Sequence, residues 1–127
     1  MAGRQPPLLD AFTAWLTAFG DAWEAADAEG MANLFALGAT MQPDPFAEPI
    51  RGRRSIVEHW QRELGGLTGV RFSAQVLGAG DTYGVAHLRV EIDADGRAAA
   101  RDGVLLAALD AGGRCTSLRG WWHEARR

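Results

Sequence analysis

The chain has 127 residues, of which 47% are hydrophobic and 23% are charged, and its formal net charge at pH 7 is −3. This length and composition are typical of one folded domain, so residues 1–127 are predicted to form a single domain with one core. The negative charge argues against a nucleic-acid-binding protein, because a phosphate-binding surface needs clustered excess Lys and Arg.

The single cysteine, Cys115, excludes an intrachain disulfide and a zinc site built from several thiolates. Residues 1–7 lack a charged start followed by an apolar stretch, so no signal peptide is expected. No apolar run approaches the ~20 residues that a membrane span needs. The expectation is therefore a soluble cytoplasmic protein that binds neither a membrane nor a metal or other cofactor.

The first predicted helix begins at Pro6 and Pro7, because proline is favoured in the first turn of a helix. Gly20 lies inside this helix and should weaken it by about 1 kcal/mol relative to alanine. The helix should end near Ala26. Its apolar residues recur at spacings of three and four and form one wide stripe, made of Leu8, Phe12, Trp15, Leu16, Phe19 and Trp23.

A short second helix should follow, with Asp27 as its N-cap. It should run through Leu34 and Phe35 until Gly38 closes it. The next residues, 39–42, are predicted to form a short strand. This strand leads into a loop that prolines hold stiff, because each proline fixes its own φ angle and restricts the residue before it.

Residues 53–64 are predicted to form a third helix, after which the hydrophobic period changes from about 3.6 to 2. Asp95-Gly96 and Gly112-Gly113 are hairpin signals, and residues 78–81 form a looser turn. Each strand after the first of this half should therefore pair antiparallel with the strand before it. The predicted strands span residues 70–78, 82–93, 97–109 and 114–124.

Helices followed by a long meander predict an α+β fold. Strands this long must twist and curl, so the concave face of the sheet can wrap around the helices without filling completely. The sequence therefore predicts a cone-shaped, curved antiparallel sheet around three N-terminal helices. One internal apolar pocket is expected between them.

Four stretches of the chain carry a family resemblance: AEGMANLF at 28–35, ATMQPDP at 39–45, the segment 50–60 and the segment 109–124. In this order and spacing the chain resembles the nuclear-transport-factor-two-like superfamily, in the branch of SnoaL-like polyketide cyclases and ketosteroid isomerases. The resemblance implies a cone-shaped (cystatin-like) fold, a deep apolar cavity and, usually, a homodimer. It does not imply one activity, since this fold is shared by enzymes and non-enzymes.

The resemblance to ketosteroid isomerases also assigns places to single residues. Leu105 and Phe19 stand where those enzymes carry the two hydrogen-bond donors of the oxyanion hole, an aspartic acid and a tyrosine. Steroid isomerisation that depends on those donors is therefore not expected. Asp44 matches the general base within one residue, and Trp122 and Leu118 match residues that line the pocket.

Asp44 and His59 are the candidate catalytic residues. A carboxylate at the end of the strand, near the cavity mouth, is suited to act as a base, and a neighbouring histidine is suited to act as an acid or partner. The alternatives are a plain Asp-Pro turn that faces solvent and a half-exposed histidine on a helix flank. The expected pocket lining is Phe19, Trp23, Phe46, Trp60, Leu88, Val90, Leu105, Leu118 and Trp122, while the directions of Asp102 and Glu124 stay open.

The opposite, convex face of the sheet mixes a large aromatic residue with arginine and histidine, a composition that is enriched at protein interfaces. We expect a homodimer through this face rather than a metal site, because its two histidines lack an evident third ligand. The residues concerned are His87, Arg89, Arg119, Trp121 and His123.

Three functional hypotheses follow. The first is an isomerase- or cyclase-type enzyme that uses Asp44 as general base on a small hydrophobic, cyclic or polyketide-like ligand. The second is a non-catalytic ligand-binding or dimerisation module. The third, an epoxide hydrolase, needs an Asp–Arg–Asp arrangement, and the strand alternation turns Arg89 and Arg119 away from the pocket.

Overall fold

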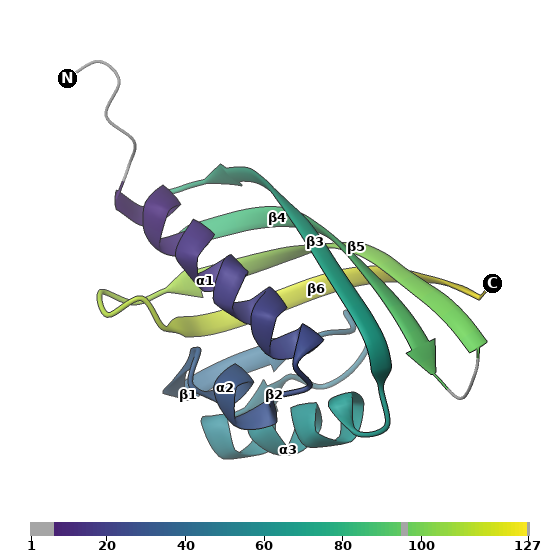
Figure 1. Cartoon of the computed structure of the whole chain (residues 1–127). Coiled ribbons are helices and arrows are strands. Elements are labelled where there is room, and N and C mark those ends of the chain that lie inside the picture. Colours follow the sequence, from purple (N-terminus) through teal and green to yellow (C-terminus); the bar gives the residue numbers. More distant parts are fainter. Residues whose placement is uncertain (1–6, 95–96, 127) are drawn as a thin grey trace.

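The computed structural model describes residues 7–94 and 97–126. The helices are α1 (Pro7–Glu24), α2 (Ala28–Ala32) and α3 (Arg53–Leu64). The strands are β1 (Phe35–Gln42), β2 (Ile50–Arg51), β3 (Thr68–Ala79), β4 (Tyr83–Ala94), β5 (Arg97–Leu109) and β6 (Cys115–Arg126). The helices cover one side of a strongly curved sheet whose strand order is β2-β1-β6-β5-β4-β3 (Figure 1). The predicted α+β class is therefore confirmed.

Strands β3 to β6 form the predicted antiparallel meander. The hairpin signal at Asp95-Gly96 lies outside the described residues. The signal at Gly112-Gly113 is confirmed, since Gly113 has φ +80 and the carboxylate of Asp110 accepts the N–H groups of Gly112 and Arg114 at 2.9 and 3.0 Å. A left-handed residue of this kind is favourable only for glycine and a few others.

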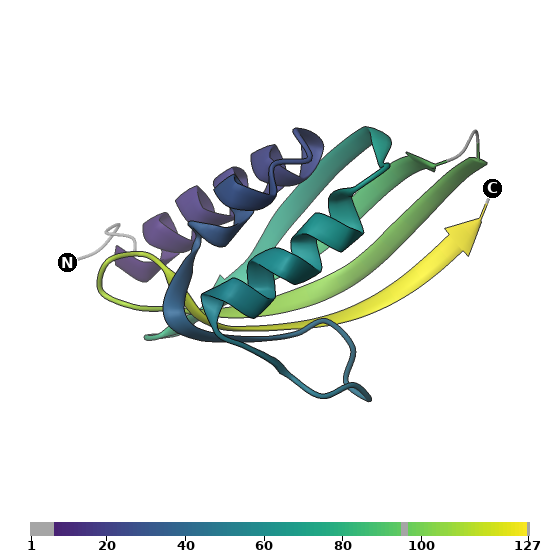
Figure 2. The same ribbon diagram turned by 90° about the horizontal axis from the view of Figure 1, so that it is seen from below.

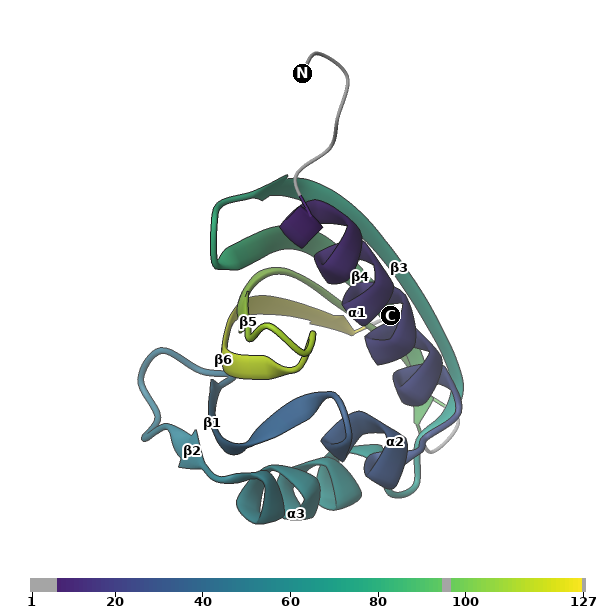
Figure 3. The same ribbon diagram turned by 90° about the vertical axis from the view of Figure 1, so that its left-hand side faces the viewer.

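The sheet is mixed, which corrects the expectation of a purely antiparallel one. Strand β1 pairs in parallel with β6, with Met41 opposite Leu118, and the short β2 pairs antiparallel with β1. Viewed from the end, the sheet curls around the helices without closing (Figure 3). Local periodicity cannot show this pairing, because the two strands are joined by most of the chain.

The second helix is shorter than expected. Asp27 is its N-cap, as predicted, and accepts the N–H of Gly30 at 2.9 Å, but the helix ends at Ala32 and Phe35 already begins β1. The Leu34 carbonyl accepts the Trp15 indole N–H, and the Phe35 carbonyl accepts two N–H groups of Arg53. These partners, distant in sequence, favour the strand over another helical turn, and no local pattern reveals them.

Helix α1 lies close against β3 at Gly20. A Cβ atom at this position would overlap the Phe72 ring, so glycine allows an approach that alanine would prevent. The local weakening of the helix is therefore offset by packing. Figure 2 shows α1 and α3 on the same side of the sheet.

No helix within residues 7–94 and 97–126 is both long enough and apolar enough to cross a membrane.

Candidate functional site

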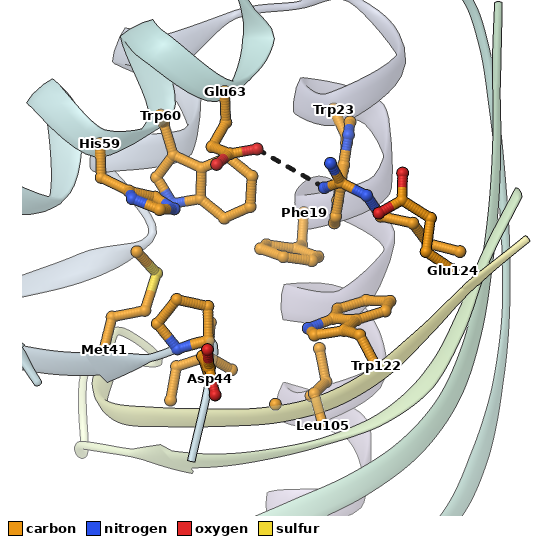
Figure 4. A pocket seen from close by; sticks show the side chains of 14 residues that line it. Phe19, Trp23, Met41, Asp44, His59, Trp60, Glu63, Leu105, Trp122 and Glu124 are labelled. Carbon is orange, nitrogen blue, oxygen red and sulfur yellow. Dashed lines mark ion pairs between the residues drawn. The ribbon is translucent and has the colours of Figure 1, made fainter. Parts of the chain in front are cut away.

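A cavity of about 380 Å³ lies between α1, α3 and the inner face of the sheet (Figure 4). It brings Asp44 and His59 together with six of the predicted lining residues. The side chains and glycine that line it are Phe19, Trp23, Met41, Pro43, Asp44, His59, Trp60, Glu63, Arg101, Leu105, Leu118, Gly120, Trp122 and Glu124.

One wall of the cavity is a cluster of aromatic rings from α1, α3 and β6. The ring centroids of Trp23 and Trp60 are 5.1 Å apart, those of Phe19 and Trp60 are 5.7 Å apart, and those of Trp23 and Trp122 are 5.9 Å apart. All three pairs meet edge to face, which is a favourable geometry for aromatic rings. The wall is therefore rigid, apolar and built from residues distant in sequence.

The position of Trp122 depends on two glycines on the inner face of the sheet. In the strand register Gly103 lies opposite Trp122, and Gly120 lies two residues before Trp122 on β6. A Cβ atom at Gly103 would lie 2.9 Å from the Trp122 ring, and one at Gly120 would lie 2.6 Å from its Nε1. The missing side chains leave room for the indole on the sheet.

Asp44 lies at the mouth of the cavity, in the loop that follows β1. Its side chain is exposed, and its Oδ1 accepts the backbone N–H of Phe46 at 2.9 Å. The aspartate thus forms the predicted turn and lines the cavity at the same time. Its second carboxylate oxygen makes no hydrogen bond within the part of the chain that the structure describes.

His59 projects from α3 into the cavity and is half-buried (Figure 4). Burial lowers the pKa of its imidazole from the ordinary 6.5. Glu63 opposes this shift, whereas Arg62 and Arg101 add to it. The ring is therefore neutral at pH 7, with one nitrogen to donate and one to accept.

We expect the His59→Gln variant to lose part of the pH dependence of stability. As the pH falls below 6.5, the unfolded chain binds a proton at His59 before the folded protein does. The free energy of unfolding of the wild type therefore decreases from pH 6.5 down through the folded pKa, and the variant lacks this decrease. Urea unfolding at several pH values measures the free energy of unfolding of both proteins. An equal decrease below pH 6.5 in the wild type and the variant would contradict the prediction.

Three predicted lining residues lie elsewhere. Phe46 is 97% exposed, because the turn at Asp44 carries it away from the cavity. Leu88 and Val90 are fully buried in the core, where the curve of the sheet packs β4 against the helices. Leu88 and Val90 face inward as predicted, but they belong to the hydrophobic core and do not line the cavity.

Sequence reasoning missed Arg101 and Glu63, two charged residues at one end of the cavity. Arg101 lies on the inner face of β5, between Val90 and Glu124 in the strand register. Its Nη1 is 3.5 Å from Oε2 of Glu63, and this ion pair joins β5 to α3. The alternation 101, 103, 105 along the strand could have revealed it. The sequence argued against an epoxide hydrolase because Arg89 and Arg119 point away from the pocket. Arg101 does face the cavity, between the carboxylates of Glu63 and Glu124, so that argument no longer holds.

The structure also shows where Glu124 and Asp102 point, which the sequence left open. Glu124 lines the cavity, and Asp102 lies on the outer face of the sheet. There Asp102 accepts a 2.7 Å hydrogen bond from His87, with Arg89 3.5 Å away. The hydrogen bond with His87 lowers the pKa of the Asp102 carboxyl, and nearby positive charges add to this.

Among the described residues, no group of three or more His, Cys, Asp and Glu side chains is arranged to hold a metal ion. Cys115 is buried at the start of β6, and burial raises the pKa of its thiol to about 12. The thiol therefore stays protonated and packs as a small apolar group.

Comparison with known proteins places this geometry in a family. The steroid Delta-isomerase of Nocardioides simplex is 30% identical over 104 residues, which cover 80% of this chain and 81% of that protein. Among solved structures, the Delta 5-3-ketosteroid isomerase of Mycobacterium sp. matches with a TM-score of 0.79 and 19% identity, covering 92% of this chain and 98% of the other.

The epoxide hydrolase/cyclase-like enzyme SalBIII, described for pyran ring formation in the polyether salinomycin, matches with a TM-score of 0.83 and 14% identity. The match covers 97% of this chain and 100% of that one, so the whole fold is shared. A family model described as the SnoaL-like domain matches residues 16–118. The chain therefore belongs to the SnoaL-like domain family, consistent with the nuclear-transport-factor-two-like superfamily.

Proposed function

We propose that the chain works as a single-domain enzyme of isomerase or cyclase type on a small hydrophobic, cyclic or polyketide-like carbonyl compound. The observation that carries this proposal is the position of Asp44, a carboxylate at the mouth of a cavity with aromatic walls. The names of the relatives, a steroid isomerase and an epoxide hydrolase/cyclase-like enzyme, support the same reaction class.

In this proposal Asp44 removes a proton from the carbon next to the ligand carbonyl. One of its oxygens is held by the Phe46 N–H, so the other is free to accept the proton. His59, neutral and facing the same cavity, is the proposed partner of Asp44 and hydrogen-bonds the ligand there. The aromatic wall keeps bulk water away from one side of the ligand.

The Asp44→Asn variant tests the assignment of the base. We expect it to slow exchange of the α-protons of a cyclic β,γ-unsaturated ketone in D₂O by about 10² to 10⁴, because a positioned base contributes that much. NMR measures the exchange. Glu48→Gln is the matched control, since Glu48 is an exposed carboxylate in the same loop. Equal rates in both variants would show that Asp44 is not the base.

The alternative is a non-catalytic ligand-binding module. It predicts that aromatic ligands raise the melting temperature of the protein while no ketone undergoes exchange, with or without Asp44. A second catalytic candidate is epoxide opening, favoured by the Glu63–Arg101 pair in the cavity. It predicts incorporation of ¹⁸O from labelled water into a diol, with the incorporation lost in Glu63→Gln.

We also propose that the outer face of the sheet binds a second copy of the chain, in the cytoplasm. Trp121 is 38% exposed on this face, with the Arg119 guanidinium 5.1 Å from its ring centroid, and a half-exposed tryptophan with arginine is typical of interfaces. His87, Arg89 and His123 surround it on the neighbouring register positions. The buried thiol of Cys115 suits a reducing compartment.

Light scattering tests the dimer. The wild type should have twice the mass of the chain, and Trp121→Glu should be a monomer of unchanged fold. Leu37→Glu, at an exposed leucine of β1, is the control and should remain a dimer. A monomeric wild type would contradict the proposal.

A further inference from the structure

The cavity has hydrocarbon where negative charge on a ligand oxygen would need a donor. Phe19 and Leu105 both line it, and neither carries a hydrogen-bond donor. Proton removal beside a carbonyl moves an electron pair onto the carbonyl oxygen. Such an oxyanion in a partly dry site is unstable without a preorganised donor or positive charge.

The Arg101 guanidinium is a donor with unused capacity. It offers five N–H groups in a planar fork. Its contact with Glu63 is 3.5 Å long, well beyond the ~2.8 Å of a charge-assisted hydrogen bond. Among the described residues, the arginine side chains that donate hydrogen bonds are Arg53 and Arg71. The side chain of Arg101 is only 30% exposed, so water solvates it incompletely.

The other donors of the cavity are weaker candidates. The indole nitrogens of Trp23 and Trp60 have no hydrogen-bond partner within the described part of the chain, but they are also closed off from the cavity space. The neutral His59 carries no positive charge at pH 7. Arg101 therefore combines a full charge, free N–H groups and a place on the cavity wall.

We propose that Arg101 binds the carbonyl oxygen of the ligand and stabilises the enolate that forms there. This role of Arg101 rests on the proposed function, because Arg101 would stabilise the enolate that forms when Asp44 removes the proton. The ligand would span the cavity between Asp44 and the end where Glu63 holds Arg101, which lie on opposite sides of it (Figure 4). The ligand class is a cyclic ketone whose carbonyl lies at this charged end.

The step balances within the cavity. The Asp44 carboxylate takes the α-proton, the C–H electron pair forms the new C=C bond, and the C=O π pair moves to the oxygen beside Arg101. The carboxylic acid of Asp44 then returns the proton to the γ-carbon of a β,γ-unsaturated ketone, the enolate electrons restore the C=O bond, and the conjugated isomer forms. No other reactant is required.

The negative charges of Glu63 and Glu124 disfavour an anion beside Arg101. Removing one of these carboxylates should therefore have the opposite effect to removing the Arg101 charge. Glu63 is 39% exposed, so water can solvate it when Arg101 turns to the ligand. A half-exposed ion pair of this length contributes little to stability, and the exchange of partners costs little. Removing the Glu63 charge should therefore strengthen binding of an oxyanion, whereas removing the Arg101 charge should weaken it.

The experiment uses 2-naphthol, whose ionised form resembles an enolate, and 2-methoxynaphthalene, which cannot ionise. Fluorescence titration at a pH above the naphthol pKa gives the Kd of each. We expect Arg101→Gln to weaken naphtholate binding at least tenfold and Glu63→Gln to strengthen it about threefold, with little change for the methoxy compound. Arg101→Lys should lie between the wild type and Arg101→Gln, because it keeps the charge but loses the fork.

Three results would overturn the inference: no naphtholate binding by the wild type, equal loss of both probes in Arg101→Gln, or no loss of either. The result for Arg101 can be distinguished from the result for Asp44 as the base. If Asp44→Asn retains proton exchange while Arg101→Gln loses naphtholate, the proposed reaction is wrong and the oxyanion site stands. If Asp44→Asn loses exchange and Arg101→Gln binds naphtholate normally, the reaction stands and Arg101 is not its oxyanion partner.

Discussion

Alanine at Gly103 should destabilise the protein, whereas alanine at Gly120 should mainly shrink the cavity. Both glycines lie beside the Trp122 indole, but their surroundings differ. A methyl group at Gly103 would overlap the backbone carbonyl of Trp121, so the two strands must shift. Overpacking of this kind costs about 1 to 3 kcal/mol, and we expect Gly103→Ala to lower the free energy of unfolding by that amount.

At Gly120 the nearest atom is Nε1 of Trp122, 2.6 Å from the added carbon. A ring at the end of a side chain can turn aside where a backbone cannot, so Gly120→Ala should fold with nearly wild-type stability. The indole then moves into the cavity, and naphthalene-type ligands should bind at least several-fold more weakly. Gly78→Ala, with no atom within 4 Å, is the control for both measurements. Equal stability of the Gly103 and Gly120 variants would contradict the assigned contacts.

Leu88→Ala should be among the most destabilising single substitutions, at about 2 to 5 kcal/mol, because it leaves a void in a close-packed core. Leu88 is 0% exposed on β4 and belongs to the hydrophobic core. Leu37→Ala is the matched control, since Leu37 is 76% exposed, and its effect should stay within about 0.5 kcal/mol.

Chemical denaturation of both leucine variants measures the difference. If Leu88 lined the cavity instead of the core, water or a ligand could fill the space, and Leu88→Ala would cost little while changing ligand affinity. That pattern would contradict the placement of Leu88 in the hydrophobic core, away from the cavity lining.

Much of the second half of the fold could be predicted because its signals are local. Alternation of apolar residues set the inward phase of β4, and glycines marked the turn at Gly112-Gly113. The end of the second helix and the parallel pairing of β1 with β6 could not be predicted. Both depend on contacts such as the Arg53 side chain with the Phe35 carbonyl, which only the folded chain brings together.

The candidate site was predictable in part for the same reason. Asp44 and His59 were located from the loop and helix that carry them, and both line one cavity. Phe46 was misplaced because the side chain of Asp44 binds its N–H and turns it to solvent. Arg101 was overlooked because a charged residue amid alanines suggests an exposed position, although the strand period turns it inward.

The parallel pairing of β1 with β6 has a consequence for the order of assembly during synthesis. Until β6 emerges from the ribosome, β1 has only the short β2 as a partner, and the edge of β5 is also unpaired. Four cavity-lining positions, among them Leu118 and Trp122, lie on β6. Closing such a long loop is slow, and exposed strand edges favour aggregation. The cavity therefore cannot be completed until β6 has paired with β1 and β5, and a nascent chain without β6 should be prone to aggregation.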